Sequence, residues 1–257
     1  MSTDSSSSLT SFLNSPVVKA TATVFGTIFV FLAGQLIGIF ILISVLNSLG
    51  FNGVLLEDLF DNNSIVQFLS ILLIESIIIG LIYSYYRFRD QEFLGSIGLK
   101  RSPSIDSFLY AIIAYVLYFI TFVTIAFLLS IFIPSLDVDQ SQQIGFNAAF
   151  GFDLVIVYAS LVILPAIAEE IIFRGVLYQR LKNLIHPMTA AVVTSLVFGA
   201  AHLEFFSSGP LNWIAAIDTF VFSFFLIALV VKSKSLWGAI MLHAIKNSIA
   251  FVLLFII

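Results

Sequence analysis

This 257-residue chain contains no cysteine and few charged residues. Asp, Glu, Lys and Arg together make up 10% of it, whereas a soluble globular chain carries about 25%. Apolar residues reach 60%, which is more hydrocarbon than a water-soluble fold of this length can hide. The lack of cysteine excludes disulfides, thiolate catalysis and cysteine-based metal centres. The low charge and the high apolar content together indicate a multi-pass membrane protein.

A basic arm or patch is missing as well. The formal net charge is −4, so nothing in the sequence favours nucleic acid as a partner. The first 16 residues are rich in serine and carry one charged side chain, Asp4. Such a segment buries too little apolar surface to order itself. We therefore expect a disordered tail over residues 1–16 and a single transmembrane helical domain over residues 17–257.

Long apolar stretches predict an all-α polytopic bundle of about seven transmembrane spans, with eight helices as the alternative. A bilayer core about 30 Å thick needs about 20 helical residues, and most of the stretches have that length. The fifth is short and is expected to lie within the bundle. The predicted spans are Ala20–Leu46, Ile65–Tyr86, Phe108–Ile133, Phe152–Leu177, Met188–Leu203, Trp213–Val231 and Leu236–Ile257.

Basic and acidic residues fall on opposite sides of this predicted topology. Seven spans place the termini on opposite sides, and the positive-inside rule assigns the basic side to the cytoplasm. We therefore expect an integral protein of the cell (plasma) membrane with a cytoplasmic N-terminus. The basic loops carry Lys19, Arg87, Arg89, Lys100, Arg101, Arg180, Lys182, Lys232 and Lys234, and the opposite loops Glu57, Asp58, Asp61, Asp137, Asp139 and Glu204.

Ionisable side chains inside the spans are costly in lipid, so each one is a functional candidate. The informative group lies in residues 152–257. We interpret Glu75 and Lys246 as structural, and Asp218 lies nearer a span end. The candidates are Glu169, Glu170 and Arg174 in the fourth span, His202 in the fifth, and His243 with Asn247 in the seventh.

Helical spacing separates the roles of the two adjacent glutamates. Glu170 and Arg174 lie four residues apart on one helix face, with the acid on the favoured N-terminal side. An ion pair between them keeps Glu170 charged and fixed. Glu169 points about 100° away and has no cation beside it. At about 1.5 Å rise per residue, Glu169, His202 and His243 reach depths of roughly 12 to 21 Å from the cytoplasmic helix ends. Three helices thus bring polar groups to one layer.

A glutamate, two histidines and an amide in one layer suit hydrolysis by activated water. The glutamate takes a proton from the water, and a histidine orients the water or protonates the leaving amine. Histidine and asparagine side chains also donate hydrogen bonds to an oxyanion. Two histidines and two glutamates are equally suitable ligands for a divalent ion that activates water, although no HExxH motif is present. These residues are compatible with a Zn²⁺ site and with a metal-free site, and both remain alternatives.

Three motifs in the last hundred or so residues carry a family resemblance. They resemble the motifs of the CPBP intramembrane proteases, the CAAX-protease and bacteriocin-processing group also called Abi proteins. That family includes the Ras-converting type of CAAX endopeptidase. The motifs are Glu169-Glu170-x-x-x-Arg174, Phe198-x-x-x-His202 and His243-x-x-x-Asn247, in this order.

The resemblance implies a CAAX-prenyl-protease-like endopeptidase, either of a glutamate type or a metalloendopeptidase. It implies that Glu169 activates water and that Glu170, His202, His243 and Asn247 complete the site. If a metal is present, the ligands by this likeness are Glu169, His202 and His243. The expected partners are membrane lipid and a peptide or membrane-protein substrate, and the sequence does not show that the substrate is prenylated.

Two functions of other classes are alternatives. One is a catalytically silent immunity or regulatory scaffold with the same fold, in which Glu169 is not needed for the biological effect. The other is a small-solute transporter, which is less favoured because the sequence shows no inverted repeat or paired broken helices.

Overall fold

A computed structural model describes residues 12–138, 140, 145–146, 148–205 and 209–257 of the chain. Most of the predicted N-terminal tail, residues 1–11, lies outside the described residues, as does Asp139 of the predicted acidic loops. The described residues contain helices and no strands. The prediction of an all-α fold is confirmed.

The helices follow one another with short connections. The long ones are α2 (Pro16–Ser48), α4 (Ser64–Phe88), α6 (Ile105–Phe132), α11 (Trp213–Ser233) and α12 (Trp237–Phe255). A further span is continuous but changes its hydrogen-bonding pattern along its length: α7 (Asp153–Tyr158), η1 (Ala159–Ile163), α8 (Leu164–Glu169), η2 (Glu170–Tyr178) and α9 (Gln179–Leu181), of which η1 and η2 are π-helices. The shorter helices are α3 (Val54–Asn62), α5 (Phe93–Ser96) and α10 (Pro187–Ala200).

Local sequence signals explain where several of these helices begin. The side chain of Ser104 accepts a hydrogen bond from the backbone N–H of Ser107 at the start of α6, and Asn212 caps α11 in the same way through Ala215. Pro16 and Pro187 occupy the first turns of α2 and α10, where a missing N–H costs nothing. These are standard N-terminal signals of helices.

Six of the predicted spans are confirmed, because in the described part of the chain six helices are long and apolar enough to cross a membrane. The protein is therefore an integral, multi-pass membrane protein. The fifth predicted span, Met188–Leu203, is different. It corresponds to α10, whose 14 residues extend about 21 Å and fall short of a bilayer core about 30 Å thick.

The position of His202 corrects one expectation from the sequence. His202 was expected inside the fifth span, but α10 ends at Ala200 and His202 lies in the turn that follows. Its backbone N–H bonds to the carbonyl of Gly199 at 3.0 Å, a three-residue spacing that tightens the last turn. Glu204 then adopts a left-handed backbone conformation with φ of 55°, so the right-handed helix cannot continue through it.

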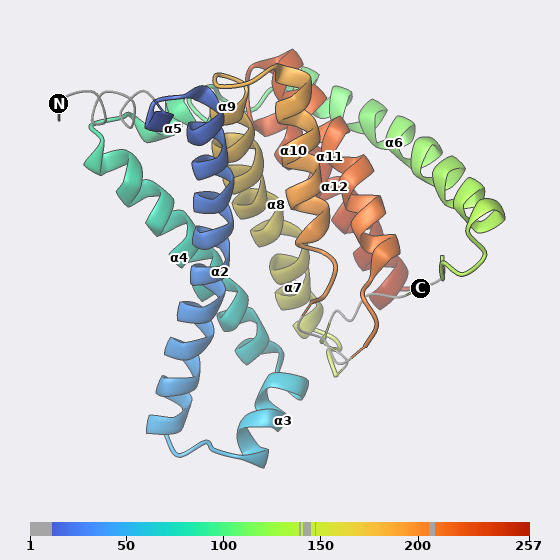
Figure 1. The fold of residues 1–257 in the computed structure, drawn as a ribbon. Coiled ribbons are helices and arrows are strands. Elements are labelled where there is room, and N and C mark those ends of the chain that lie inside the picture. The colour runs from blue at the N-terminus through green and yellow to red at the C-terminus, as the bar shows by residue number, and fades with distance from the viewer. Residues whose placement is uncertain (1–11, 139, 141–144, 147, 206–208) are drawn as a thin grey trace.

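The continuous span from α7 to α9 runs through the middle of the bundle (Figure 1). Helices α2 and α4 pack on one side of it, and α10, α11 and α12 on the other. Helix α6 lies farthest from α2 and packs on α11 and α12. The central span therefore carries Glu169 and Glu170 at a place where neighbouring helices surround them.

Close packing between α2 and α4 depends on two glycines four residues apart. A Cβ added at Gly34 would lie 2.2 Å from Cγ1 of Ile78, and one at Gly38 would lie 2.7 Å from Cγ1 of Ile74. Small residues at this spacing let membrane helices approach closely. The two helices act as a packed pair against the central span.

The basic loops meet at one end of the bundle. The backbone N–H of Leu236 donates to the carbonyl of Gly98 at 2.9 Å, and Nε1 of Trp237 donates to the carbonyl of Arg101 at 2.7 Å. Figure 1 shows α2 starting at this end and α12 finishing at the other. The assignment of the basic end to the cytoplasm stays a prediction.

Candidate active site

Glu170 is a fully enclosed polar residue of the site. It begins η2, and its side chain and that of Arg174 are both fully buried. Glu170 Oε1 accepts a hydrogen bond from Arg174 Nη1 at 3.0 Å. The i,i+4 ion pair predicted from the spacing is therefore present. Both groups are buried, and each is the counter-charge of the other.

The same oxygen also holds His243 of α12. Glu170 Oε1 lies 2.9 Å from His243 Nδ1, and because a carboxylate only accepts, Nδ1 carries the hydrogen. Such a bond fixes the ring orientation and leaves Nε2 pointing away from Glu170. A residue in the central span thus orients a histidine 73 positions later in the chain.

Glu169 lies on the other side of the His243 ring. Its Oε2 is 3.9 Å from Nε2 of His243, a separation too long for a hydrogen bond. The Glu169 side chain is 20% exposed whereas that of Glu170 is fully buried. Among the described residues Oε2 of Glu169 has no hydrogen-bond partner. The two adjacent glutamates therefore differ: Glu170 is fixed in an ion pair, whereas Oε2 of Glu169 makes no hydrogen bond to the described residues.

Phenylalanine rings form the walls around these polar groups. Arg174 Cζ lies 4.1 Å from the centroid of the Phe198 ring, a cation–π contact. The same ring has edge contacts with His202 at 4.8 Å and His243 at 6.2 Å between centroids. Phe198 thus links the motif of α10 to the ion pair and separates the two histidine rings.

His202 is held by the last turn of the preceding helix, α10. Its Nδ1 lies 2.9 Å from the carbonyl oxygen of Phe198, and since a carbonyl only accepts, this nitrogen carries a hydrogen. In the neutral ring Nε2 is then an acceptor. Although His202 lies beyond the end of α10, this bond and the Phe198 contact keep its ring beside the site.

Asn247 bonds to the central span. Its Nδ2 donates to the backbone carbonyl of Leu161 at 2.9 Å. In an α-helix that carbonyl would accept from the residue at position 165, but Pro165 has no N–H. The proline therefore explains why a side chain from α12 reaches the π-helix η1. His243 and Asn247 both face the central span, and they bind it at different heights.

A second polar cluster lies next to His243, and the sequence indicated only part of it. Lys246 Nζ is 2.7 Å from Asp218 Oδ2, and the Tyr118 hydroxyl donates to the same carboxylate. The Phe222 ring lies between this cluster and His243, 5.7 Å from the His243 ring and 4.9 Å from Lys246 Nζ. The interpretation of Lys246 as structural agrees with this pairing. Tyr118 was not a candidate in the sequence, because candidates were selected as ionisable side chains inside the spans and tyrosine is uncharged.

The donor atoms do not fit a three-ligand metal site. Among the described residues, no three side chains of His, Asp or Glu are grouped so that they could hold one ion. Nδ1 of His243 is bonded to Glu170, and Nδ1 of His202 to a backbone carbonyl. Glu169, His202 and His243, the ligands implied by the resemblance, are not brought together around one point.

The site is that of a helical membrane bundle with a free glutamate beside an oriented histidine. Residues 151–249 match the family model of type II CAAX prenyl endopeptidase Rce1-like proteins. This range contains Glu169, Glu170, His202, His243 and Asn247, and the predicted resemblance to the CPBP endopeptidases is confirmed over it. No curated protein and no solved structure matches the chain. The match covers the C-terminal part of this membrane protein, which contains all three motifs.

Proposed function

We propose that the protein hydrolyses peptide bonds within or beside the bilayer, with water activated by Glu169. One observation carries the proposal: Oε2 of Glu169, which has no hydrogen-bond partner among the described residues, lies 3.9 Å from Nε2 of a histidine that a buried ion pair holds in place. The match of residues 151–249 to an endopeptidase family supports it. The substrate class is a peptide or membrane protein, and prenylation of it is not part of the proposal.

The proposed nucleophile is a water held between Glu169 and His243. A water oxygen about 2.8 Å from both Glu169 Oε2 and His243 Nε2 forms ordinary hydrogen bonds with each. In the proposed reaction Glu169 takes one proton from this water, and the oxygen adds to the scissile carbonyl carbon. Breakage of the C–N bond then returns the proton to the leaving amine. The products are a carboxylic acid, which keeps the second proton of the water, and an amine, and Glu169 is again a carboxylate.

Glu170 and Arg174 support this reaction without touching the substrate. If His243 takes a proton during the reaction, the Glu170 carboxylate 2.9 Å away stabilises the resulting imidazolium. Arg174 keeps that carboxylate charged. We assign Glu170 and Arg174 as positioning residues for His243.

His202 and Asn247 complete the proposed site. Asn247 uses one N–H on Leu161, and its second N–H is a donor suited to a tetrahedral oxyanion. Nε2 of the neutral His202 ring accepts hydrogen bonds, which suits the orientation of water or of a substrate N–H. The family resemblance supports these two roles, as do the hydrogen-bond donors of Asn247 and the acceptor nitrogen of His202.

The test is replacement of Glu169 by glutamine, which keeps the shape of the side chain and removes the base. New protein termini in membranes that contain the wild-type protein identify substrates, and peptides spanning those cleavage sites are then tested with purified protein. We expect Glu169→Gln to lower cleavage at least roughly 100-fold with an unchanged Tm, and Glu57→Gln in the α3 segment to cleave like wild type.

The same experiment separates the enzyme from the alternatives. Wild-type cleavage by Glu169→Gln would show that the assigned base is wrong. A biological effect that persists in this variant without cleavage would favour the silent scaffold. If the biological effect requires an ion gradient and the purified protein cleaves no peptide, the result would favour a transporter.

A further inference from the structure

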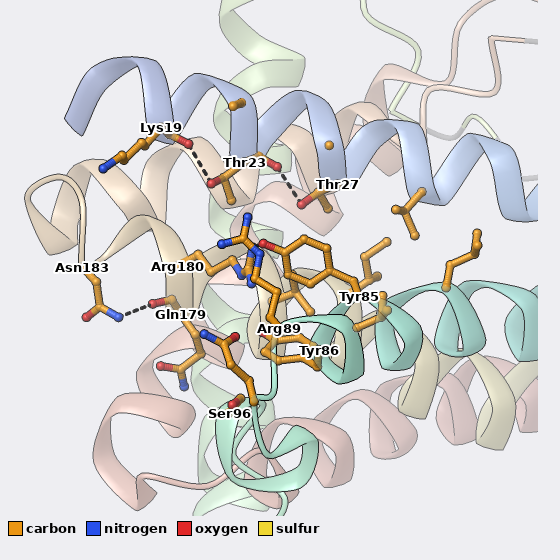
Figure 2. Close-up of a pocket in the computed structure, with 18 of the residues that line it drawn as sticks. Lys19, Thr23, Thr27, Tyr85, Tyr86, Arg89, Ser96, Gln179, Arg180 and Asn183 are labelled. Carbon is orange, nitrogen blue, oxygen red and sulfur yellow. Dashed lines mark hydrogen bonds between the residues drawn. The ribbon is translucent and has the colours of Figure 1, made fainter. Parts of the chain in front are cut away.

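A cavity of about 950 Å³ lies at the basic end of the bundle, between α2, the end of α4 and α9 (Figure 2). Its apolar wall is formed by Phe29, Val30, Leu81 and Ile82. The Phe29 side chain is 71% exposed, so this wall opens toward the surrounding lipid. None of the lining residues belongs to the proposed catalytic set.

Two arginines meet beside one tyrosine ring at the polar end of this cavity. Arg180 Cζ lies 4.4 Å and Arg89 Cζ 5.3 Å from the centroid of Tyr85. Arg180 Nη1 also donates to the Tyr85 hydroxyl at 2.8 Å. Figure 2 shows both guanidinium groups at this ring, with Lys19 of α2 farther out at the rim. An aromatic ring therefore holds two cations that come from different helices.

No carboxylate neutralises these cations. Across the part of the chain that the structure describes, no Asp or Glu oxygen lies within ion-pair distance of Lys19, Arg89 or Arg180. Glu92 is among the lining residues, but its Oε2 accepts a hydrogen bond from the backbone N–H of Gly95 at 2.7 Å. The cavity thus has an excess of positive charge, and guanidinium groups bind phosphate oxygens well.

The geometry points to an anionic glycerophospholipid as the occupant of this cavity. Its phosphate would lie on Arg89 and Arg180, and an acyl chain would follow the apolar wall past Phe29 and Ile82. Basic pockets between membrane helices bind anionic head groups in this way. The cavity is far larger than a free phosphate needs, and its open side faces the membrane that supplies the lipid.

Binding of two short-chain lipids to the purified full-length protein tests this assignment. Dioctanoyl phosphatidylglycerol and dioctanoyl phosphatidylcholine are compared in neutral detergent by native mass spectrometry. We expect phosphatidylglycerol to bind more tightly than phosphatidylcholine, and Arg89→Gln with Arg180→Gln to weaken its binding by roughly 25-fold, about fivefold for each arginine. Arg87→Gln is the matched control, because Arg87 is an exposed residue of the same helix that does not line the cavity.

A second pair of variants tests the apolar wall and does not depend on the arginines. Gly26 lines the cavity, and a Cβ added there meets nothing within 4 Å, which is equally true of Gly80 outside the cavity. We expect Gly26→Leu to fill the space and weaken the binding of both lipids at least tenfold. Gly80→Leu, which makes the same change on α4, should bind like wild type.

Several results would overturn the assignment. Equal affinity for the two lipids would show that the arginines do not select an anionic head group. Equally strong binding of glycerol 3-phosphate would show a site for a free phosphate and no lipid site. Displacement of the lipid by a peptide only when its C-terminal carboxylate is free would show that the cavity receives peptide ends.

Discussion

Glu170 Oε1 is shared by His243 Nδ1 at 2.9 Å and Arg174 Nη1 at 3.0 Å. One buried oxygen therefore balances a cation and fixes the ring of a proposed active-site histidine. Among the described residues the second oxygen of Glu170 has no hydrogen-bond partner, so the whole arrangement depends on a single atom. Loss of its charge affects stability and activity together.

Replacement of Glu170 by glutamine should therefore destabilise the protein. The change leaves Arg174 as a buried cation without a counter-charge, and breaking such a pair costs roughly 3–5 kcal/mol. We expect a lower Tm in detergent and a loss of peptide cleavage, because His243 also loses the carboxylate that orients it. Arg174→Met in the same chain should restore part of the Tm and none of the cleavage. A Tm equal to that of the wild type for Glu170→Gln alone would show that the ion pair is not a stabilising element.

Asn247 should be needed for stability as well as activity. Asn247→Leu keeps the approximate size of the side chain but leaves the carbonyl of Leu161 without its donor, which costs about 1–3 kcal/mol. We expect a Tm drop and slower cleavage, measured on the same preparation. The control is Thr124→Ala on α6, which removes an exposed hydroxyl bonded to the carbonyl of Ile120 four residues earlier and should change the Tm less. An unchanged Tm for Asn247→Leu would show that this bond does not hold α12 to the central span.

Removal of metal should leave cleavage unchanged. The described residues do not group three His, Asp or Glu side chains around one point, and Nδ1 of both His202 and His243 is engaged in a hydrogen bond. We expect elemental analysis of purified protein to give well below one zinc ion per chain, and chelation to have no effect on the cleavage rate. Stoichiometric zinc together with loss of cleavage on its removal, and recovery on its return, would favour the metalloprotease mechanism.

Sequence patterns predicted the ion pair because its cause is local. Glu170 and Arg174 lie one helical turn apart, so their spacing alone places them together. The distinction between Glu169 and Glu170 followed from the same geometry. The apolar stretches likewise predicted the long helices, since bilayer thickness sets their length.

Other features depend on contacts between distant segments, which no single-chain pattern encodes. The bond from Asn247 to Leu161 spans 86 residues, and only Pro165 hinted that a carbonyl nearby lacked its helical donor. The place of His202 beyond α10 depends on a tight turn after Ala200, which apolar composition does not reveal. The cavity beside Tyr85 was not predicted because Arg89 and Arg180 meet only when α4 and α9 are packed.

The orientation of the bundle can be tested with single cysteines, because the chain has none of its own. The loop that contains Ser102 is tied to the start of α12 by the bond from Leu236 to Gly98, so one position reports on the whole basic end. Ser102 and Asn52 are both exposed. Ser102 belongs to the loop between α5 and α6 and Asn52 to the loop between α2 and α3, and these loops lie at opposite ends of the bundle in Figure 1. By the positive-inside rule we expect a membrane-impermeant thiol reagent to label Asn52→Cys in intact cells, and to label Ser102→Cys only after lysis. The reverse pattern would place the basic end outside the cell and overturn the predicted cytoplasmic N-terminus.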